Sequence, residues 1–131
     1  MERRTAVATD QAPGAIGPYS QAIRAGGFIF ASGSLGIDPA SGDLVEGGVE
    51  SQTRQALANL ASILEAAGSG LTQVVKTTVF LQSIQDFARM NAVYAEFFPE
   101  APPARSAVEV AALPRGAAVE IEAIALVAEA V

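Results

Sequence analysis

Residues 102–110 read Pro-Pro-Ala-Arg-Ser-Ala-Val-Glu-Val, and they place one arginine behind a rigid double proline at the start of an expected strand. The sequence that follows is apolar for a long way, apart from a few glutamates. Arg105 therefore has few polar neighbours along the chain and no obvious structural role. A planar guanidinium grips a carboxylate through two parallel hydrogen bonds, so we interpret Arg105 as the residue that holds the carboxylate of a small substrate.

The composition predicts an oligomer. The chain has 131 residues, of which 50% are hydrophobic and 17% charged, and a typical soluble domain carries about 25% charged residues. A domain of this size has much surface for its volume, so the apolar side chains do not all fit inside one copy. We expect a homo-oligomer that buries apolar faces between subunits. The alternative is a monomer with an unusually apolar surface.

Charge and residue usage exclude several classes of function. A net charge of -6 disfavours binding to nucleic-acid phosphates. The chain has neither cysteine nor histidine, which excludes disulfides, thiol nucleophiles, the usual zinc sites and Ser-His catalysis. No apolar run is long enough to span a membrane, and residues 1–4 are not followed by a signal-type apolar segment. We expect a cytoplasmic protein with no metal, no nucleic-acid partner and no membrane partner.

Two helices are predicted from the apolar spacing. Residues 49–67 repeat apolar or small side chains at i, i+3 and i+4, with Asn59 placed mostly off that stripe. A second helix is expected over about 86–98, capped by Ser83 or Asp86. Its apolar stripe consists of Phe87, Met90, Tyr94 and Phe97.

Six short segments are expected to form strands, at residues 3–8, 20–25, 28–32, 74–81, 106–111 and 118–128. Gly26 and Gly27 predict a tight hairpin between the second and third segments. The last two segments are expected to form another hairpin around residues 113–116. Together the pattern predicts one α+β domain over residues 1–131, with two helices on one face of a sheet and another subunit on the opposite face.

Three polar side chains have an interpretation besides binding or catalysis. Tyr19 follows Gly17-Pro18, and it either presents its hydroxyl on a fixed turn or simply packs at a strand start. Glu120 alternates with apolar residues on the same strand face as Glu122, so it needs a partner or a raised pKa. A structural ion pair between Arg105 and Glu120, with no ligand, is the alternative to a substrate site.

Several segments resemble the RidA family, also called the YjgF or reactive-intermediate deaminase family. The resemblance runs nearly from end to end and in the same order, so no single short motif carries it. The segments are residues 15–19 (AIGPY), 32–33 (SG), 76–80 (KTTVF), Asn91 with 94–98 (YAEFF), 103–110 (PARSAVEV), 113–114 (LP) and 120–125 (EIEAIA).

This resemblance implies a chorismate-mutase-like domain that assembles as a homotrimer around a barrel-like core of sheets, with clefts between subunits. It also implies an enzyme without a cofactor that hydrolyses reactive enamines and imines, such as 2-aminoacrylate and 2-iminobutanoate, to 2-oxo acids and ammonia. A non-catalytic protein that binds small carboxylates such as 2-oxobutyrate is the alternative. A ribonuclease or translation inhibitor is disfavoured by the net charge.

Residue by residue, the resemblance gives Arg105, Glu120 and Tyr19 catalytic roles: Arg105 binds the substrate carboxylate, Glu120 orients or deprotonates water, and Tyr19 lines the cleft. It places Ser32, Gly33 and Asn91 around the pocket. Ala107 stands at a position that contributes its backbone, where relatives often carry cysteine, so a backbone role survives and a thiol role does not. Ala112 replaces a frequent basic residue, which changes the charge near the cleft.

Overall fold

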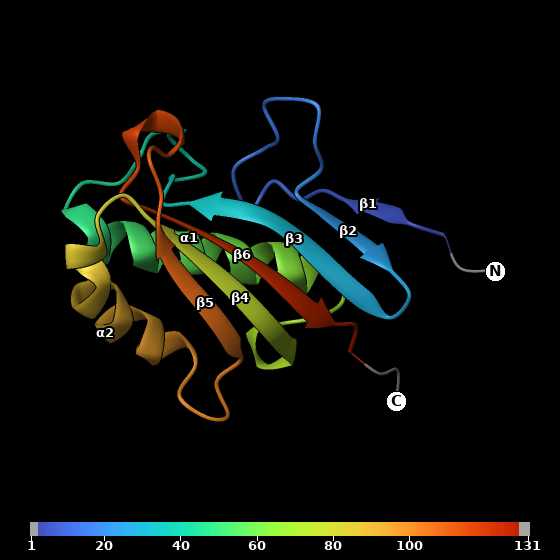
Figure 1. Ribbon diagram of the computed structural model, residues 1–131. Helices are drawn as coiled ribbons and strands as arrows, with labels where there is room; N and C mark the ends of the chain where they lie inside the picture. The colour runs from blue at the N-terminus through green and yellow to red at the C-terminus, as the bar shows by residue number, and fades with distance from the viewer. Residues whose placement is uncertain (1–2, 129–131) are drawn as a thin grey trace.

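The computed structural model describes residues 3–128, in which a six-stranded mixed sheet carries two helices on one face (Figure 1). The α+β architecture predicted from the sequence is thereby confirmed. The order of strands across the sheet is β1-β2-β3-β6-β4-β5. The elements are β1 (Thr5–Val7), β2 (Ala22–Ala25), β3 (Phe28–Leu35), α1 (Gly48–Ala66), β4 (Val74–Leu81), α2 (Phe87–Phe97), β5 (Ala104–Glu109) and β6 (Val119–Leu126), with short 3₁₀ turns at Leu71–Gln73, Ile84–Asp86 and Pro114–Gly116.

The hairpin between β2 and β3 forms as predicted. Gly26 and Gly27 have φ values of 59° and 82°, and two consecutive positive φ angles are what a two-residue hairpin turn of matching twist requires. The strands then pair antiparallel from Ala25 opposite Phe28 to Ala22 opposite Ala31. This turn fixes the register of β3, which forms one wall of the site described below.

The predicted hairpin between the last two strands is wrong. β6 lies between β3 and β4 and pairs antiparallel with both, whereas β5 pairs in parallel with β4 and forms the edge of the sheet. α2 makes the crossover that a parallel pair needs. The burial patterns agree with these positions: alternate residues of β6 are buried beneath α1, as expected for a central strand, while β5 has the exposed pattern of an edge strand.

Helix α1 covers the sheet with the apolar stripe predicted from its sequence. Leu57, Leu60 and Leu64 are completely buried. The position of Asn59 was predicted wrongly, because this amide is also buried, and its Nδ2 donates to the carbonyl oxygens of Leu35 (3.1 Å) and Ile37 (2.8 Å). Asn59 thus ties α1 to the end of β3. Neither helix within residues 3–128 has the length and apolar character needed to cross a membrane.

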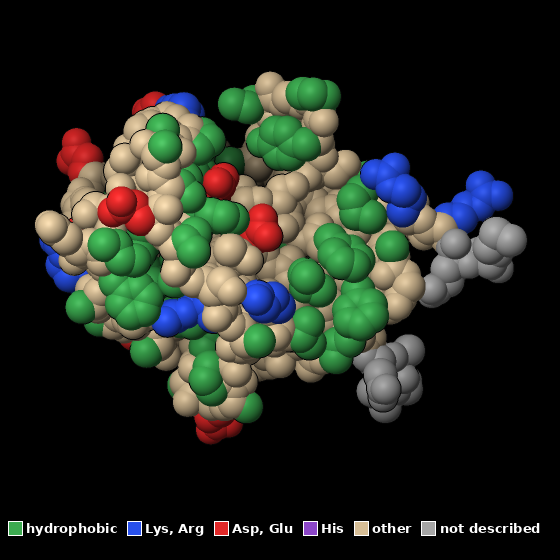
Figure 2. Space-filling view, in the orientation of Figure 1, with side chains coloured by type: hydrophobic (Ala, Val, Ile, Leu, Met, Phe, Trp, Pro, Cys, Tyr) green, Lys and Arg blue, Asp and Glu red, His purple; other side chains and the backbone are tan. Residues whose placement is uncertain are grey.

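The face of the sheet opposite the helices is bare in the single chain. Large apolar side chains lie on it and stay 39–45% exposed: Phe28, Phe30, Val108 and Leu126. Figure 2 shows this face, with hydrophobic side chains gathered over β2, β3 and β6 and acidic side chains beside a hollow. A contiguous apolar patch of this kind is typical of an interface between proteins.

We predict that Gly36→Ala destabilises the fold. A Cβ at Gly36 lies 2.5 Å from Cα and 2.6 Å from the carbonyl oxygen of Gln52 in α1, and backbone atoms cannot move aside cheaply. The expected loss is about 1–3 kcal/mol in the free energy of unfolding, measured by urea denaturation. Gly70→Ala is the matched control, because nothing lies within 4 Å of its Cβ and its φ of -179° suits any residue. Equal stability of the two variants contradicts the prediction.

Candidate functional site

Arg105 lies on the helix-facing side of β5, where it is half-buried. Its Nη1 donates to Oδ1 of Asn91 at 2.6 Å. Its Cζ lies 5.4 Å from the ring centroid of Phe87 and 4.8 Å from that of Tyr94. No carboxylate within residues 3–128 forms an ion pair with this guanidinium. The remaining N–H groups are therefore available for an external anion.

All three partners of Arg105 come from α2, at positions i, i+4 and i+7. Phe87, Asn91 and Tyr94 lie on one stripe of this helix, as that spacing dictates. Asn91 is thus not a free surface amide, because it orients the arginine. Ala107 lies two residues after Arg105 and on the same strand face, opposite Val79. The structure brings Arg105, Asn91 and Ala107 together on one side of the sheet.

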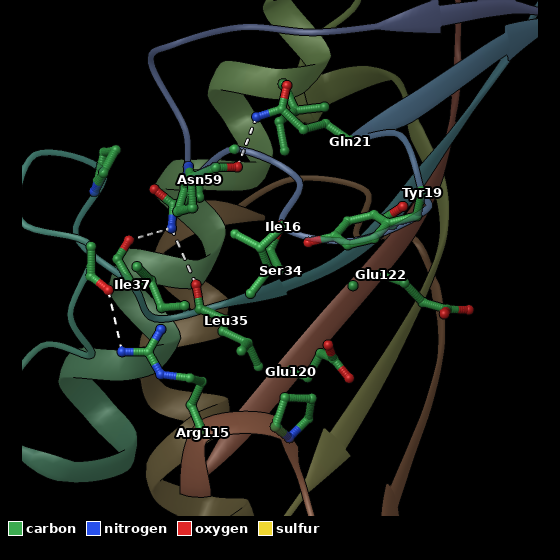
Figure 3. Close-up of a pocket in the computed structure, with 18 residues that line it drawn as sticks. Ile16, Tyr19, Gln21, Ser34, Leu35, Ile37, Asn59, Arg115, Glu120 and Glu122 are labelled. Atoms are coloured by element: carbon green, nitrogen blue, oxygen red, sulfur yellow. Dashed lines mark hydrogen bonds between the residues drawn. The ribbon is translucent and has the colours of Figure 1, made fainter.

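A pocket of about 690 Å³ lies beneath the loop of residues 9–19, where it borders the Glu120 side of the sheet and reaches Asn59 and Ile63 of α1 past the end of β3 (Figure 3). Tyr19, Ser32, Gly33 and Glu120, which were predicted as site residues, all line it. The Glu122 side chain points away from the space that Tyr19 and Glu120 border (Figure 3). No group of three or more acidic side chains within residues 3–128 is arranged to hold a metal ion.

The Glu120 carboxyl sits close against the backbone of β3. A Cβ at Gly33 would lie 2.7 Å from Cδ and Oε2 of Glu120, so glycine at this position leaves room for the carboxyl. Burial, with a smaller contribution from the negative charge of Glu122, raises the pKa of Glu120 above its ordinary value. Glu120 forms no ion pair with a cation of the described part of the chain, and a carboxyl with a raised pKa suits proton transfer.

The ion pair between Arg105 and Glu120, which the sequence analysis gave as the alternative to a substrate site, does not form within one chain. Arg105 pairs with Thr77 of β4, whose side chain is buried on the helix-covered face of the sheet. Glu120 pairs with Phe80 of β4, whose side chain lies on the other face. Side chains alternate across a sheet, so the two charges project from opposite faces. The predicted site residues thus fall into two separate groups, one on each side.

The loop that carries Tyr19 is fixed by a buried amide. Gln21 accepts from the Thr9 N–H through Oε1 at 2.7 Å, and its Nε2 donates to the carbonyl oxygens of Thr9 (3.1 Å) and Pro13 (2.8 Å). Ser32 closes the base of the loop, because its Oγ donates to the Ser20 carbonyl oxygen at 2.6 Å. Tyr19 itself remains 52% exposed, so its hydroxyl is presented at the pocket rather than packed in the core.

Sequence reasoning missed several residues of these two groups. Phe87 and Tyr94 were assigned only to the core stripe of α2, although their spacing with Asn91 was a usable signal. Ile16 and Arg115 line the pocket and were not predicted to do so. Arg115 turns toward the Gly42 carbonyl oxygen, to which its Nη2 donates at 3.3 Å (Figure 3).

Comparison with known proteins finds relatives that match nearly the whole described chain. The family model for endoribonuclease L-PSP matches residues 9–127. A RutC family protein of Pyrococcus horikoshii is 56% identical over 117 residues, covering 89% of this chain and 93% of that protein. The human 2-iminobutanoate/2-iminopropanoate deaminase is 52% identical over 123 residues, covering 94% of this chain and 90% of the human protein.

Solved structures share the fold throughout. RidA from the Antarctic bacterium Psychrobacter sp. superposes with a TM-score of 0.90 at 46% identity, covering 93% of this chain and 98% of that chain. TdcF of E. coli, in a crystal structure with bound serine, superposes with a TM-score of 0.89 at 41% identity, covering the same shares of the two chains.

We predict that Glu120→Gln stabilises the protein increasingly as the pH rises. Because the pKa of Glu120 is raised in the folded chain, folding favours the neutral carboxyl. The neutral carboxyl contributes its full stability below the ordinary glutamate pKa of about 4.3, and this contribution is lost as the pH rises through the pKa of Glu120 in the folded chain. Glutamine keeps the shape without the charge. The difference in melting temperature between variant and wild type should be small near about pH 4 and positive at neutral pH, at one protein concentration.

Glu122→Gln serves as the matched variant, because it removes only the repulsion that Glu122 exerts on Glu120. Its stabilisation should have the same sign and a smaller size. If the difference in melting temperature between Glu120→Gln and wild type stays constant or falls as the pH rises, the ionised Glu120 carboxylate does not destabilise the fold and the prediction is wrong.

Proposed function

The chain belongs to the endoribonuclease L-PSP family, which includes RidA, and from that membership we propose that it hydrolyses 2-imino acids and their enamine tautomers to 2-oxo acids and ammonia. Mammalian members that are 52–54% identical to it are named 2-iminobutanoate/2-iminopropanoate deaminase. The chemistry proposed below uses only side chains of this protein and water.

One observation supports this proposal above the others: a guanidinium and a carboxyl of raised pKa, neither of which forms an ion pair among residues 3–128, lie on opposite faces of the same sheet. Arg105 can accept a substrate carboxylate, and Glu120 can accept a proton from water. β5 is the edge strand, so the Arg105 group lies at the border of the sheet, and a second copy that packs against this edge would bring its Glu120 pocket beside the Arg105 group in a shared cleft.

In the proposed mechanism, Arg105 fixes the carboxylate of the imino acid. Water attacks the carbon of the C=N bond, its proton passes to Glu120, and Glu120 transfers that proton to the nitrogen, which becomes an amine. The carbinolamine then collapses: Glu120 takes the hydroxyl proton and passes it to the amine, the oxygen forms the C=O bond, and the C–N bond breaks to release ammonia. Tyr19 donates either to the nitrogen or to a carboxylate oxygen. Such imines hydrolyse unaided, and each tenfold acceleration requires only about 1.4 kcal/mol.

The proposed assembly is a homotrimer in which the bare sheet faces form a barrel-like core. The apolar side chains of Phe28, Phe30, Val108 and Leu126 support it, because in a single chain they remain substantially exposed. Ser32 and Gly33 belong to the Glu120 side of each cleft, and Asn91 and Ala107 to the Arg105 side. A cytoplasmic location remains a prediction from the sequence.

The family's printed description also suggests ribonuclease activity, which this chain supports less well. The net charge is -6, no histidine is available for acid–base chemistry, and the pocket is bordered by two glutamates. Phosphate binding normally needs a basic surface. RNA cleavage that copurifies with the protein and survives Arg105→Ala would favour this second function.

We predict that Arg105→Ala abolishes accelerated imine hydrolysis. The assay couples the protein to a serine or threonine dehydratase and follows release of 2-oxo acid. Loss of two charge-assisted hydrogen bonds should lower kcat/KM by at least about 100-fold. Arg89→Ala is the matched control, because Arg89 is an exposed arginine of α2 that pairs with Asp86 and lies outside both groups. Activity retained by Arg105→Ala disproves the proposed mechanism.

We also predict that two inactive variants complement each other. In a mixed ring of three subunits, Arg105→Ala and Glu120→Gln chains always create one cleft in which both residues are intact. Coexpression in equal amounts should therefore restore about a quarter of wild-type activity, since about three quarters of the trimers are mixed and each has one intact cleft. Gel filtration with light scattering tests the trimer. No recovery in verified mixed trimers would place both residues of a site within one chain.

A further inference from the structure

We propose that the buried pair of hydroxyls on Thr77 and Tyr94 positions the guanidinium of Arg105, and so sets the affinity of the site for carboxylates. This inference rests on the proposed role of Arg105 as the carboxylate-binding residue. It assigns a function to two buried residues that touch neither water nor substrate in the proposed mechanism.

The contacts form a closed triangle between three elements. Thr77 on β4 and Arg105 on β5 are direct partners in the parallel ladder. Tyr94 of α2 joins them: its hydroxyl is 2.7 Å from Oγ1 of Thr77, and its ring lies 4.8 Å from Cζ of Arg105. The strand that holds Arg105 by its backbone therefore also fixes the ring against which its guanidinium rests.

Packing holds the Tyr94 ring in this orientation from a second direction. Phe98 stacks on it with a centroid distance of 4.7 Å and an interplanar angle of 38°. Tyr94 is 5% exposed and Thr77 is fully buried. A hydroxyl in such a place costs free energy unless it is paired, and here each group satisfies the other.

A core role alone does not explain this pair. Valine and phenylalanine would fill the same volume at Thr77 and Tyr94 without burying any polar group, and replacement of both hydroxyls by apolar groups is often nearly neutral. What the hydroxyls add is direction, because the hydrogen bond fixes where the ring lies along the strand. Burial raises the pKa of the Tyr94 phenol, with the Thr77 bond and the Arg105 charge opposing that shift, so the pair stays neutral and acts through geometry.

The test measures binding of 2-oxobutyrate by calorimetry and imine hydrolysis by the coupled assay, on the intact protein. Thr77→Val and Tyr94→Phe should each weaken binding and raise KM about three- to tenfold, with kcat within about twofold, since a misplaced cation–π contact affects substrate and transition state alike. Thr77→Ser keeps the hydroxyl and should retain wild-type affinity. The double variant should lose no more than either single one, because both disrupt the same hydrogen bond.

Ile29→Val controls for lost stability, because Ile29 is a fully buried residue of β3 outside both groups. It should lower the melting temperature without changing KM. Unchanged affinity in Thr77→Val and Tyr94→Phe overturns the inference, as does a Thr77→Ser variant that is as weak as Thr77→Val. If the wild type binds 2-oxobutyrate through Arg105 but does not hydrolyse imines, the proposed function fails, and the calorimetric series still decides the inference.

Discussion

The alternation of side chains across one sheet separates the two charges to which the proposed mechanism assigns substrate binding and proton transfer. Arg105 and Glu120 belong to strands that both border β4, yet they leave the sheet on opposite sides. No rotamer change brings them together within one chain, since the sheet lies between them. The proposed contact between copies would both cover the bare apolar face and bring an Arg105 group next to a Glu120 pocket.

The two sides of the sheet are built differently. On the helix side, α2 surrounds the guanidinium with two rings and an amide, so the arginine is oriented before any ligand arrives. On the bare side, a glycine in β3 and a loop tied down by Gln21 shape an open pocket around one carboxyl. A preoriented cation and an accessible acid–base group are what binding and proton transfer respectively require.

The sequence predicted those features that depend on local periodicity. The β-branched run of β4 gave its bounds correctly, the apolar spacing gave α1, and the paired glycines gave the first hairpin. It failed where distant segments decide the outcome. Neither the insertion of β6 between β3 and β4 nor the opposite orientation of Arg105 and Glu120 can be read from either strand alone. Asn59 was misplaced because its burial is supported by carbonyl groups more than twenty residues away.

Glu120 shows why the divided arrangement favours chemistry over stability. Its carboxyl is partly buried, lies near Glu122 and lacks a cation among the described residues, so each factor disfavours its ionised form. A glutamine at this position would fill the same space without the free-energy cost of a partly buried negative charge. A stabilising role would require Arg105 on the same face, where the strand register does not place it. The cost is understandable if a neighbouring copy brings a substrate to the carboxyl, because the same burial that destabilises the anion makes it a stronger base.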